Sequence, residues 1–463
     1  MRRLLILSAA LPLLLLTGCD TFVEEVDTPK DSAPYGQLNS PQDIRFLASG
    51  VQTQGANATD FLTLTSGLMS DQFRFGKNAD ASFPTYAAPD RGLPTPQNTT
   101  VGDATRALGE YRRLADSLVT AADRPNSYGE SPPITKQRAK FIGTLHGAMA
   151  RYYYATYTGL NPREGGGVLD QSEFIPSPQM YDRARQKFND ALGIAPTPRD
   201  EKIVRSLHAR SALYAATQFG SNTAGYDDAL QRAAELAESG LKAGDDPFNA
   251  QYSVQSPNEW RQQAGLARFQ IVAMDNQLNR DVVAPAGGNT HKDLSTIRSI
   301  PEVIANNSAE EARLPVISIP LESGSEFGQV KYEVETTPIP YISWEEMNLI
   351  RAELELRGED TGSESALDLV NKVRADGTLP GTGVGSETGL NRDAPFDLSA
   401  LSSVDLETVA RERDRTLFGQ GQRLPDQRRL DAVDWHLVDS FQGQTTWQYL
   451  PITSQERDNN PNL

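Results

Sequence analysis

The sequence of 463 residues contains a single cysteine, Cys19, and only four histidines. One cysteine cannot form a disulfide within the chain, so a hydrophobic core must stabilise the fold, and zinc sites built from several thiolates are excluded. The histidines are widely separated and none has the spacing of an HExxH zinc site. We therefore expect no metal and no cofactor, and nothing in the sequence supports a calcium requirement. The four are His146, His208, His291 and His436.

Positive charge is also scarce. Lys and Arg total 44 against 61 Asp and Glu, a formal charge of −17, and only ten of the basic residues are lysines. Such an acidic surface repels nucleic-acid phosphates, so nucleic-acid binding is disfavoured. A lysine-poor acidic surface suits a saline habitat, where salt screens the repulsion. A GC-rich genome that favours arginine codons explains the same composition, and the two explanations are compatible.

The chain has one long apolar run, Leu4–Leu16, and it is too short to cross a bilayer. It holds about 13 residues, whereas a transmembrane helix needs roughly 20. Two arginines precede it and Leu16–Cys19 (LTGC) ends it, the order of a bacterial lipoprotein signal. The pattern predicts cleavage before Cys19, whose thiol then carries a diacylglycerol. The alternative, an ordinary secretory signal and an incidental cysteine, gives the lone cysteine no role.

These features predict three parts of the chain. Residues 1–18 are the predicted signal peptide, and residues 19–40 a polar, acidic and flexible tether. Residues 41–463 are expected to form one helical domain with long loop insertions. The insertions lie near residues 70–102, 243–340 and 377–402.

Helical spacing of apolar residues predicts a mainly α fold. The predicted helices cover residues 104–122, 135–157, 177–192, 199–219, 226–241, 342–357, 362–374 and 404–418. Three of them place packing residues four and seven positions after a small residue, at Ala184, Ala229 and Ala366. Generic helix pairs can share this pattern, but it is typical of the second helix of a tetratricopeptide-like hairpin, where alanine lets a neighbour approach closely.

Each of these three helices is predicted to pair with the helix that precedes it. The expected hairpins are 135–157 with 177–192, 199–219 with 226–241, and 342–357 with 362–374. Minor β content is expected in the second insertion, as a short hairpin of Leu314–Ile319 and Val330–Val334. The expected architecture is a helical scaffold with a face built from loops.

The C-terminal fifth carries a set of short motifs in a fixed order. A helix that contains Arg411-Glu412-Arg413 is followed by Gly421, Arg423, Asp426 and Arg429 in a G-x-R-x-x-D-x-x-R arrangement, and Trp435 comes shortly after. The remaining motifs are Ser70-Asp71, Arg351-Ala352-Glu353, Asn371-x-Val373-Arg374, Leu450-Pro451-Ile452 and Asn460-Pro461. In this order they resemble the SusD/RagB family of outer-membrane nutrient-binding lipoproteins, which are starch-binding-protein-like. The departures from the family pattern are Leu424, Pro425, Gln427 and Thr453.

The resemblance implies a fold with four tetratricopeptide-like units, anchored by lipid in the outer membrane and facing the cell exterior. It also implies a non-enzymatic role: capture of an oligo- or polysaccharide and delivery to a SusC-like TonB-dependent transporter. The alternative function is a helical-repeat lipoprotein that binds peptide cargo or serves as a scaffold for outer-membrane protein assembly.

Sugar recognition combines aromatic faces with side chains that form paired hydrogen bonds. Two insertions supply both kinds of residue, and the resemblance places part of the ligand contact in the loop after Ser70-Asp71. The candidate ligand residues are Phe83, Tyr86, Asp90, Arg91, Tyr252, Asn258, Trp260 and Arg261. Any of them could instead anchor its own loop.

Four C-terminal residues are predicted to be structural. Arg423 and Asp426 are expected to form internal charge-assisted hydrogen bonds that tie the C-terminal segment to the helices, with Arg429 in the same motif. Trp435 is expected to fill the core or a groove. An anion site formed by the arginines of this region is the alternative.

Overall fold

The computed structural model describes residues 38–70, 72–76, 84–219, 226–264, 270–273, 316–321, 324–375, 400–430, 440–441 and 443–463. The predictions for the signal peptide, Cys19 and most of the tether lie outside these residues, as do those for Phe83 and Trp435. Among the described helices, none is both long enough and apolar enough to cross a membrane.

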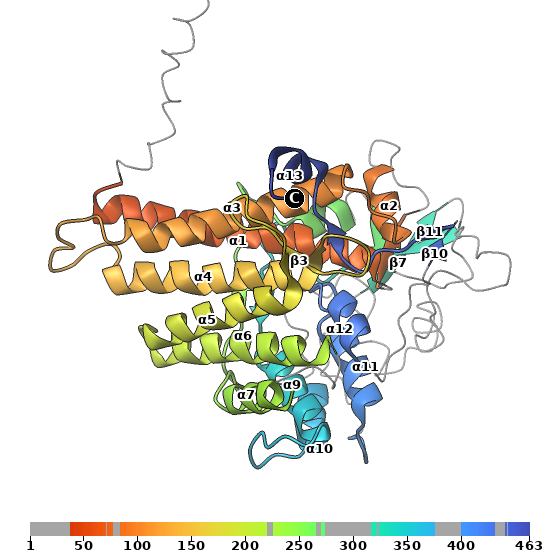
Figure 1. Cartoon of the computed structure of the whole chain (residues 1–463). Coiled ribbons are helices and arrows are strands. Elements are labelled where there is room, and N and C mark those ends of the chain that lie inside the picture. The colour runs from red at the N-terminus through yellow and green to blue at the C-terminus, as the bar shows by residue number, and fades with distance from the viewer. Residues whose placement is uncertain are drawn as a thin grey trace, which may run out of the picture.

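The scaffold consists of consecutive helices that pack in pairs and stack in chain order (Figure 1). The pairs are α1 (Pro41–Met69) with α3 (Thr99–Ala121), α4 (Lys136–Tyr157) with α5 (Ser177–Gly193), α6 (Pro198–Thr217) with α7 (Tyr226–Glu238), and α9 (Trp344–Leu356) with α10 (Ala366–Ala375). The three hairpins predicted from the alanine pattern are confirmed, and α1 with α3 makes a fourth in the described part of the chain.

Side-chain caps and glycine contacts explain where these helices start and how closely they approach. Ser40 and Asp43 form a capping box at the start of α1, and Asn98 caps α3 by accepting from the Val101 N–H at 3.1 Å. On α4, a Cβ atom at Gly143 would lie 2.8 Å from the Ala115 carbonyl oxygen of α3. Only glycine therefore permits the observed spacing of α3 and α4.

Short strands in the two longer insertions form one small sheet. Strands β1 (Phe73–Phe75), β6 (Ile271–Ala273), β8 (Gly324–Gln329) and β7 (Val316–Leu321) lie in that order, and each neighbouring pair is antiparallel. The predicted β-hairpin exists, but its second strand is β8 and not Val330–Val334. Beyond Gln329 the chain turns out of the strand, and the Gln329 side-chain oxygen accepts from the Tyr332 N–H at 2.9 Å.

Further short elements complete the loop-built face and the C-terminal region. The loop face holds a 3₁₀ turn at Pro84–Tyr86, α2 (Ala87–Asp90), and β5 (Phe248–Ala250) antiparallel to β9 (Ile339–Ile342). A π-helical turn covers Trp260–Ala264, β3 (Gly166–Gly167) pairs with β4 (Ile175–Pro176), and β10 (Ser440–Phe441) pairs with β11 (Gln444–Thr445). The C-terminal elements are α11 (Leu406–Thr416), α12 (Arg423–Arg429), β12 (Leu450–Pro451) parallel to β2 (Thr158–Gly159), and α13 (Ser454–Asn459).

A buried charge network holds α12 against the helical scaffold. Asp426 accepts from Arg413 Nε at 2.8 Å and from Arg429 Nε at 2.9 Å, and Arg429 also donates to Glu353 of α9 at 2.7 Å. Burial raises the pKa of the Asp426 carboxyl, but the two guanidinium groups outweigh it and hold this pKa below its usual range. The internal role predicted for the motif is thus present in Asp426 and Arg429. Arg423 is buried as well, and its Nε lies 3.7 Å from Asp414 of α11.

Candidate functional site

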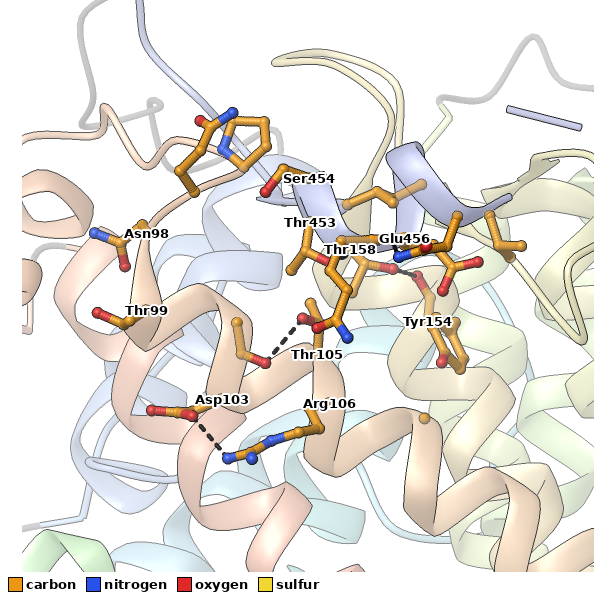
Figure 2. Close-up of a pocket in the computed structure, with 18 residues that line it drawn as sticks. Asn98, Thr99, Asp103, Thr105, Arg106, Tyr154, Thr158, Thr453, Ser454 and Glu456 are labelled. Carbon is orange, nitrogen blue, oxygen red and sulfur yellow. Dashed lines mark hydrogen bonds and ion pairs between the residues drawn. The ribbon is translucent and has the colours of Figure 1, made fainter. Parts of the chain in front are cut away.

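An open cavity of about 540 Å³ lies between the first half of α3, the end of α4 and the short helix α13 (Figure 2). A volume of this size is in the range of small-molecule sites, about 300–1,000 Å³. Its walls are rich in side chains that donate or accept hydrogen bonds. The polar lining includes Gln97, Asn98, Asp103, Arg106, Gln455 and Glu456, with the hydroxyls of Thr99, Thr105, Tyr154, Thr453 and Ser454.

The α3 wall is open because two of its cavity-facing positions are glycine. Gly102 and Gly109 are seven residues apart, so they lie on the same face of the helix as Thr105 and Arg106. A Cβ atom at Gly102 would meet no atom within 4 Å, and one at Gly109 would meet only the Tyr154 hydroxyl, at 3.6 Å. Any larger side chain at Gly102 therefore extends into free space.

Tyr154 of α4 forms part of the cavity wall. Its ring is half-buried and packs against Gly167, where a Cβ atom would lie 2.4 Å from the ring. Burial raises the pKa of the phenol to about 12, with Arg112 lowering it and Glu456 raising it. The hydroxyl is thus protonated at neutral pH, and it has no hydrogen bond to any other residue that the structure describes. It is free to donate to a ligand.

The third wall, α13, is fixed by the segment that leads into it. The Ser454 N–H donates to the Pro96 carbonyl at 2.9 Å, and the Ile452 N–H donates to the Gly159 carbonyl at 3.0 Å. Thr453, which stands where the resembling family has a proline, caps α13 by accepting from the Glu456 N–H at 3.3 Å. The closing motif of the chain therefore joins α3 and α4 across the cavity.

The first predicted ligand loop lies next to this cavity. Asn98 at the cavity edge donates to the Thr85 carbonyl at 2.8 Å, which connects α3 to the turn at Pro84–Tyr86. Tyr86 and Asp90 are only 8% and 7% exposed, while Arg91 is exposed. Of the three described candidate residues in this loop, Arg91 is thus the one whose side chain is accessible at the surface.

The second predicted loop supplies anchors to the core. Trp260 is fully buried, with its ring 4.7 Å from Phe73 and 5.9 Å from Tyr332, and its Nε1 donates to Thr63 Oγ1 at 3.0 Å. This burial leaves no ring face for a sugar, so the stacking platform predicted at Trp260 is not present in this structure.

Asn258 is also fully buried and bonds only to main-chain atoms. Its Nδ2 donates to the Val334 carbonyl at 2.8 Å, and its Oδ1 accepts from the Arg261 N–H at 2.7 Å. Half-buried Tyr252 donates to the Ala56 carbonyl at 3.0 Å. Tyr252, Asn258, Trp260 and the half-buried Arg261 all lie outside the lining of the cavity. Ligand contact by Tyr252, Arg261 and Arg91 stays a prediction.

The cavity residues were not among those predicted from the sequence. Gln97–Thr100 and Thr453–Glu456 have the composition of helix N-caps, and both segments do start helices. That both segments also line the cavity follows only from the contact between them, and they are about 350 residues apart in the sequence. In the described ranges, no group of three or more His, Cys, Asp and Glu residues could hold a metal ion.

Four stacked helical hairpins with a loop-built face and an open polar cavity define the architectural class of this chain. No protein-family model matches the sequence, and no curated protein matches it. In contrast, 66 chains of solved structures match.

One of the matching structures is a SusD superfamily protein from Bacteroides vulgatus, with a TM-score of 0.60 and 14% identity over 91% of this chain and 99% of that one. A second is surface glycan-binding protein A from Bacteroides thetaiotaomicron in complex with laminarihexaose, with a TM-score of 0.53, 16% identity, and 89% and 98% coverage. A third is NanU from B. fragilis, with a TM-score of 0.58, 10% identity, and 94% and 98% coverage. At these identities the comparison shows the fold: this chain has the fold of SusD superfamily proteins.

Proposed function

We propose that this protein is a cell-surface lipoprotein of the SusD type that captures an oligo- or polysaccharide without cleaving it. In this proposal it then passes the sugar to a SusC-like TonB-dependent transporter in the outer membrane. The fold, the predicted lipobox at Cys19 and the glycan-binding neighbours support it. The observation that carries it is the open cavity, whose lining places many hydroxyl, amide and carboxylate groups beside apolar wall residues such as Val168 and Ile452.

The chemistry of the lining matches that of a sugar. A glycan presents many hydroxyls, each of which both donates and accepts, and amide and carboxylate side chains bridge neighbouring hydroxyls. The α3 side offers Asn98 and Asp103, the α13 side offers Gln455 and Glu456, and Tyr154 adds a phenol with a partly accessible ring. The exposed Arg91, in the adjoining loop, is the proposed extension of this surface.

The test of the cavity is the substitution Gly102→Leu. A leucine here points into space that a ligand would occupy, and it meets no protein atom near its Cβ, so we expect glycan affinity to fall at least tenfold with the fold intact. The measurement is calorimetric titration with the glycan that binds most tightly in a screen of neutral and acidic polysaccharides, with sugar analysis to detect any cleavage.

Gly50→Leu is the matched control. Gly50 is also in a helix, α1, a Cβ atom there also meets nothing within 4 Å, and it lies outside the cavity lining. Equal affinity of Gly102→Leu and Gly50→Leu would place the binding site elsewhere. Failure of every glycan to bind the wild-type protein would instead favour peptide cargo or an assembly scaffold.

A further inference from the structure

We propose that the cavity selects neutral glycans and rejects sugars that carry a carboxylate, such as uronic or sialic acids. This inference rests on the proposed function and adds to it the chemical class of the ligand. It follows from the balance and the pairing of the charges that line the cavity.

The cavity lining contains more negative than positive charge. Asp103, Glu456 and Arg106 are the charged residues among those that line it, all of them in the described part of the chain. Arg106 Nη2 lies 2.8 Å from Asp103 Oδ1, one turn away on α3, as Figure 2 shows. The lining therefore has one carboxylate in excess, and its one cation already has a partner of opposite charge.

The cations behind the Tyr154 wall are also paired. Arg112 Nη2 lies 2.7 Å from Asp170, and Arg151 Nη2 lies 2.8 Å from Asp116. Neither arginine lines the cavity. A sugar carboxylate that entered would meet Arg106 as the one cation of the described lining, and it would have to share that guanidinium with Asp103.

Glu456 provides the excess charge and lies on the same side of the cavity as Tyr154 (Figure 2). Its Oε1 accepts a long hydrogen bond of 3.4 Å from Asn460, and its Oε2 has no hydrogen bond within the described residues. The Tyr154 phenol is a donor that has no partner among the described residues. A protonated phenol beside an ionised carboxylate provides one donor and one acceptor, which suits two neighbouring hydroxyls of a neutral sugar.

The same carboxylate opposes an acidic sugar. Two like charges in a half-exposed cavity repel each other enough to change affinity by about tenfold or more, and salt weakens the effect. We therefore expect acidic glycans to bind the wild-type protein at least about tenfold more weakly than neutral ones. The difference should narrow at high salt, because the repulsion acts through partly exposed groups.

The experiment compares the full-length lipoprotein in detergent with Glu456→Gln on a glycan array that carries neutral glycans beside uronic- and sialic-acid glycans. Glutamine keeps the shape of the side chain and one acceptor oxygen but removes the charge. We expect Glu456→Gln to raise affinity for acidic glycans several-fold and to narrow the preference for neutral ones. Glu130→Gln, an exposed residue outside the lining, makes the same charge change and should alter nothing.

The outcomes separate this inference from the proposed function. Acidic glycans that bind the wild type as tightly as neutral ones, and that lose affinity in Gly102→Leu, would overturn the charge selection and leave glycan capture in place. Neutral preference that survives unchanged in Glu456→Gln would also overturn it. The absence of binding to any glycan would overturn both proposals together.

Discussion

At the scale of single residues, the structure separates loop anchors from candidate ligand contacts. A tryptophan flanked by polar residues, as in Asn258-Glu259-Trp260-Arg261, fits a stacking platform and a loop anchor equally well. The decisive contacts come from Phe73, Thr63 and Tyr332, which are distant in sequence. No local pattern could have predicted whether Trp260 is exposed for stacking or buried as an anchor, because its burial depends on contacts with residues distant in the sequence.

Trp260→Ala is therefore expected to reduce stability strongly. Removal of a large buried aromatic side chain costs about 3–5 kcal/mol, and the Thr63 hydroxyl loses its donor as well. The measurement is the free energy of unfolding from urea titration, with Arg91→Ala as a control that should change stability by less than about 0.5 kcal/mol. A Trp260→Ala protein with wild-type stability would show that the indole is not part of the core.

At the scale of helices and strands, the sequence predicted the elements with a clear apolar stripe. The helices that became α3 to α7 and α9 to α11 were all predicted, with start positions wrong by up to five residues, as at α3, where Asn98 is the cap. Helix α1 was not predicted from periodicity. Its second half buries Thr63, Thr65 and Ser66, whose hydroxyls bond to carbonyls of the same helix, so polar residues occupy core-facing positions and obscure the stripe.

The surroundings of two helical glycines predict that Gly→Ala substitutions change the free energy of unfolding in opposite directions. Gly143→Ala should destabilise the protein by about 1–3 kcal/mol, because its Cβ would overlap the Ala115 carbonyl and Val119, and α3 and α4 would have to separate. Gly102→Ala should stabilise it by up to about 1 kcal/mol, because alanine favours the helix and its Cβ meets nothing.

Chemical denaturation of the two variants beside the wild type measures both effects. Gly102→Ala keeps the cavity nearly open, so it should also retain glycan affinity, in contrast to Gly102→Leu. Equal stabilities of the two alanine variants would contradict the close approach of α3 and α4.

At the scale of the whole molecule, the candidate site is formed by tertiary structure. The resemblance and the helical pattern predicted the scaffold, and the structure confirms its four hairpins in the described residues. The cavity is formed by three further features that the sequence did not reveal. They are the position of α13, the two glycines that face the cavity and the half-buried ring of Tyr154. Each depends on how the C-terminal segment returns to the first two hairpins. These contacts join segments about 350 residues apart, so no local pattern in the sequence could predict them.

The proposed anchor concerns how the whole molecule is held at the membrane. Helix α1 begins at Pro41, directly after the predicted tether, so lipidation at Cys19 would leave about 20 residues of polar chain between the lipid and the scaffold. Such a tether would reach several nanometres when extended. It would let the domain rotate toward a partner while the lipid stays in the membrane. We expect Cys19→Ala to move the protein from the membrane fraction to the soluble fraction, because the substitution removes the thiol that is predicted to carry the lipid.

The measurement is fractionation of cells that produce the wild type or Cys19→Ala, with a wash in high salt to remove proteins held by charge alone. The soluble variant should keep wild-type glycan affinity, since the substitution lies far in sequence from every residue of the cavity. Membrane retention of Cys19→Ala after the wash would contradict the lipid anchor and point to a tightly bound membrane partner. Loss of glycan affinity in a folded Cys19→Ala protein would instead show that capture depends on the membrane setting.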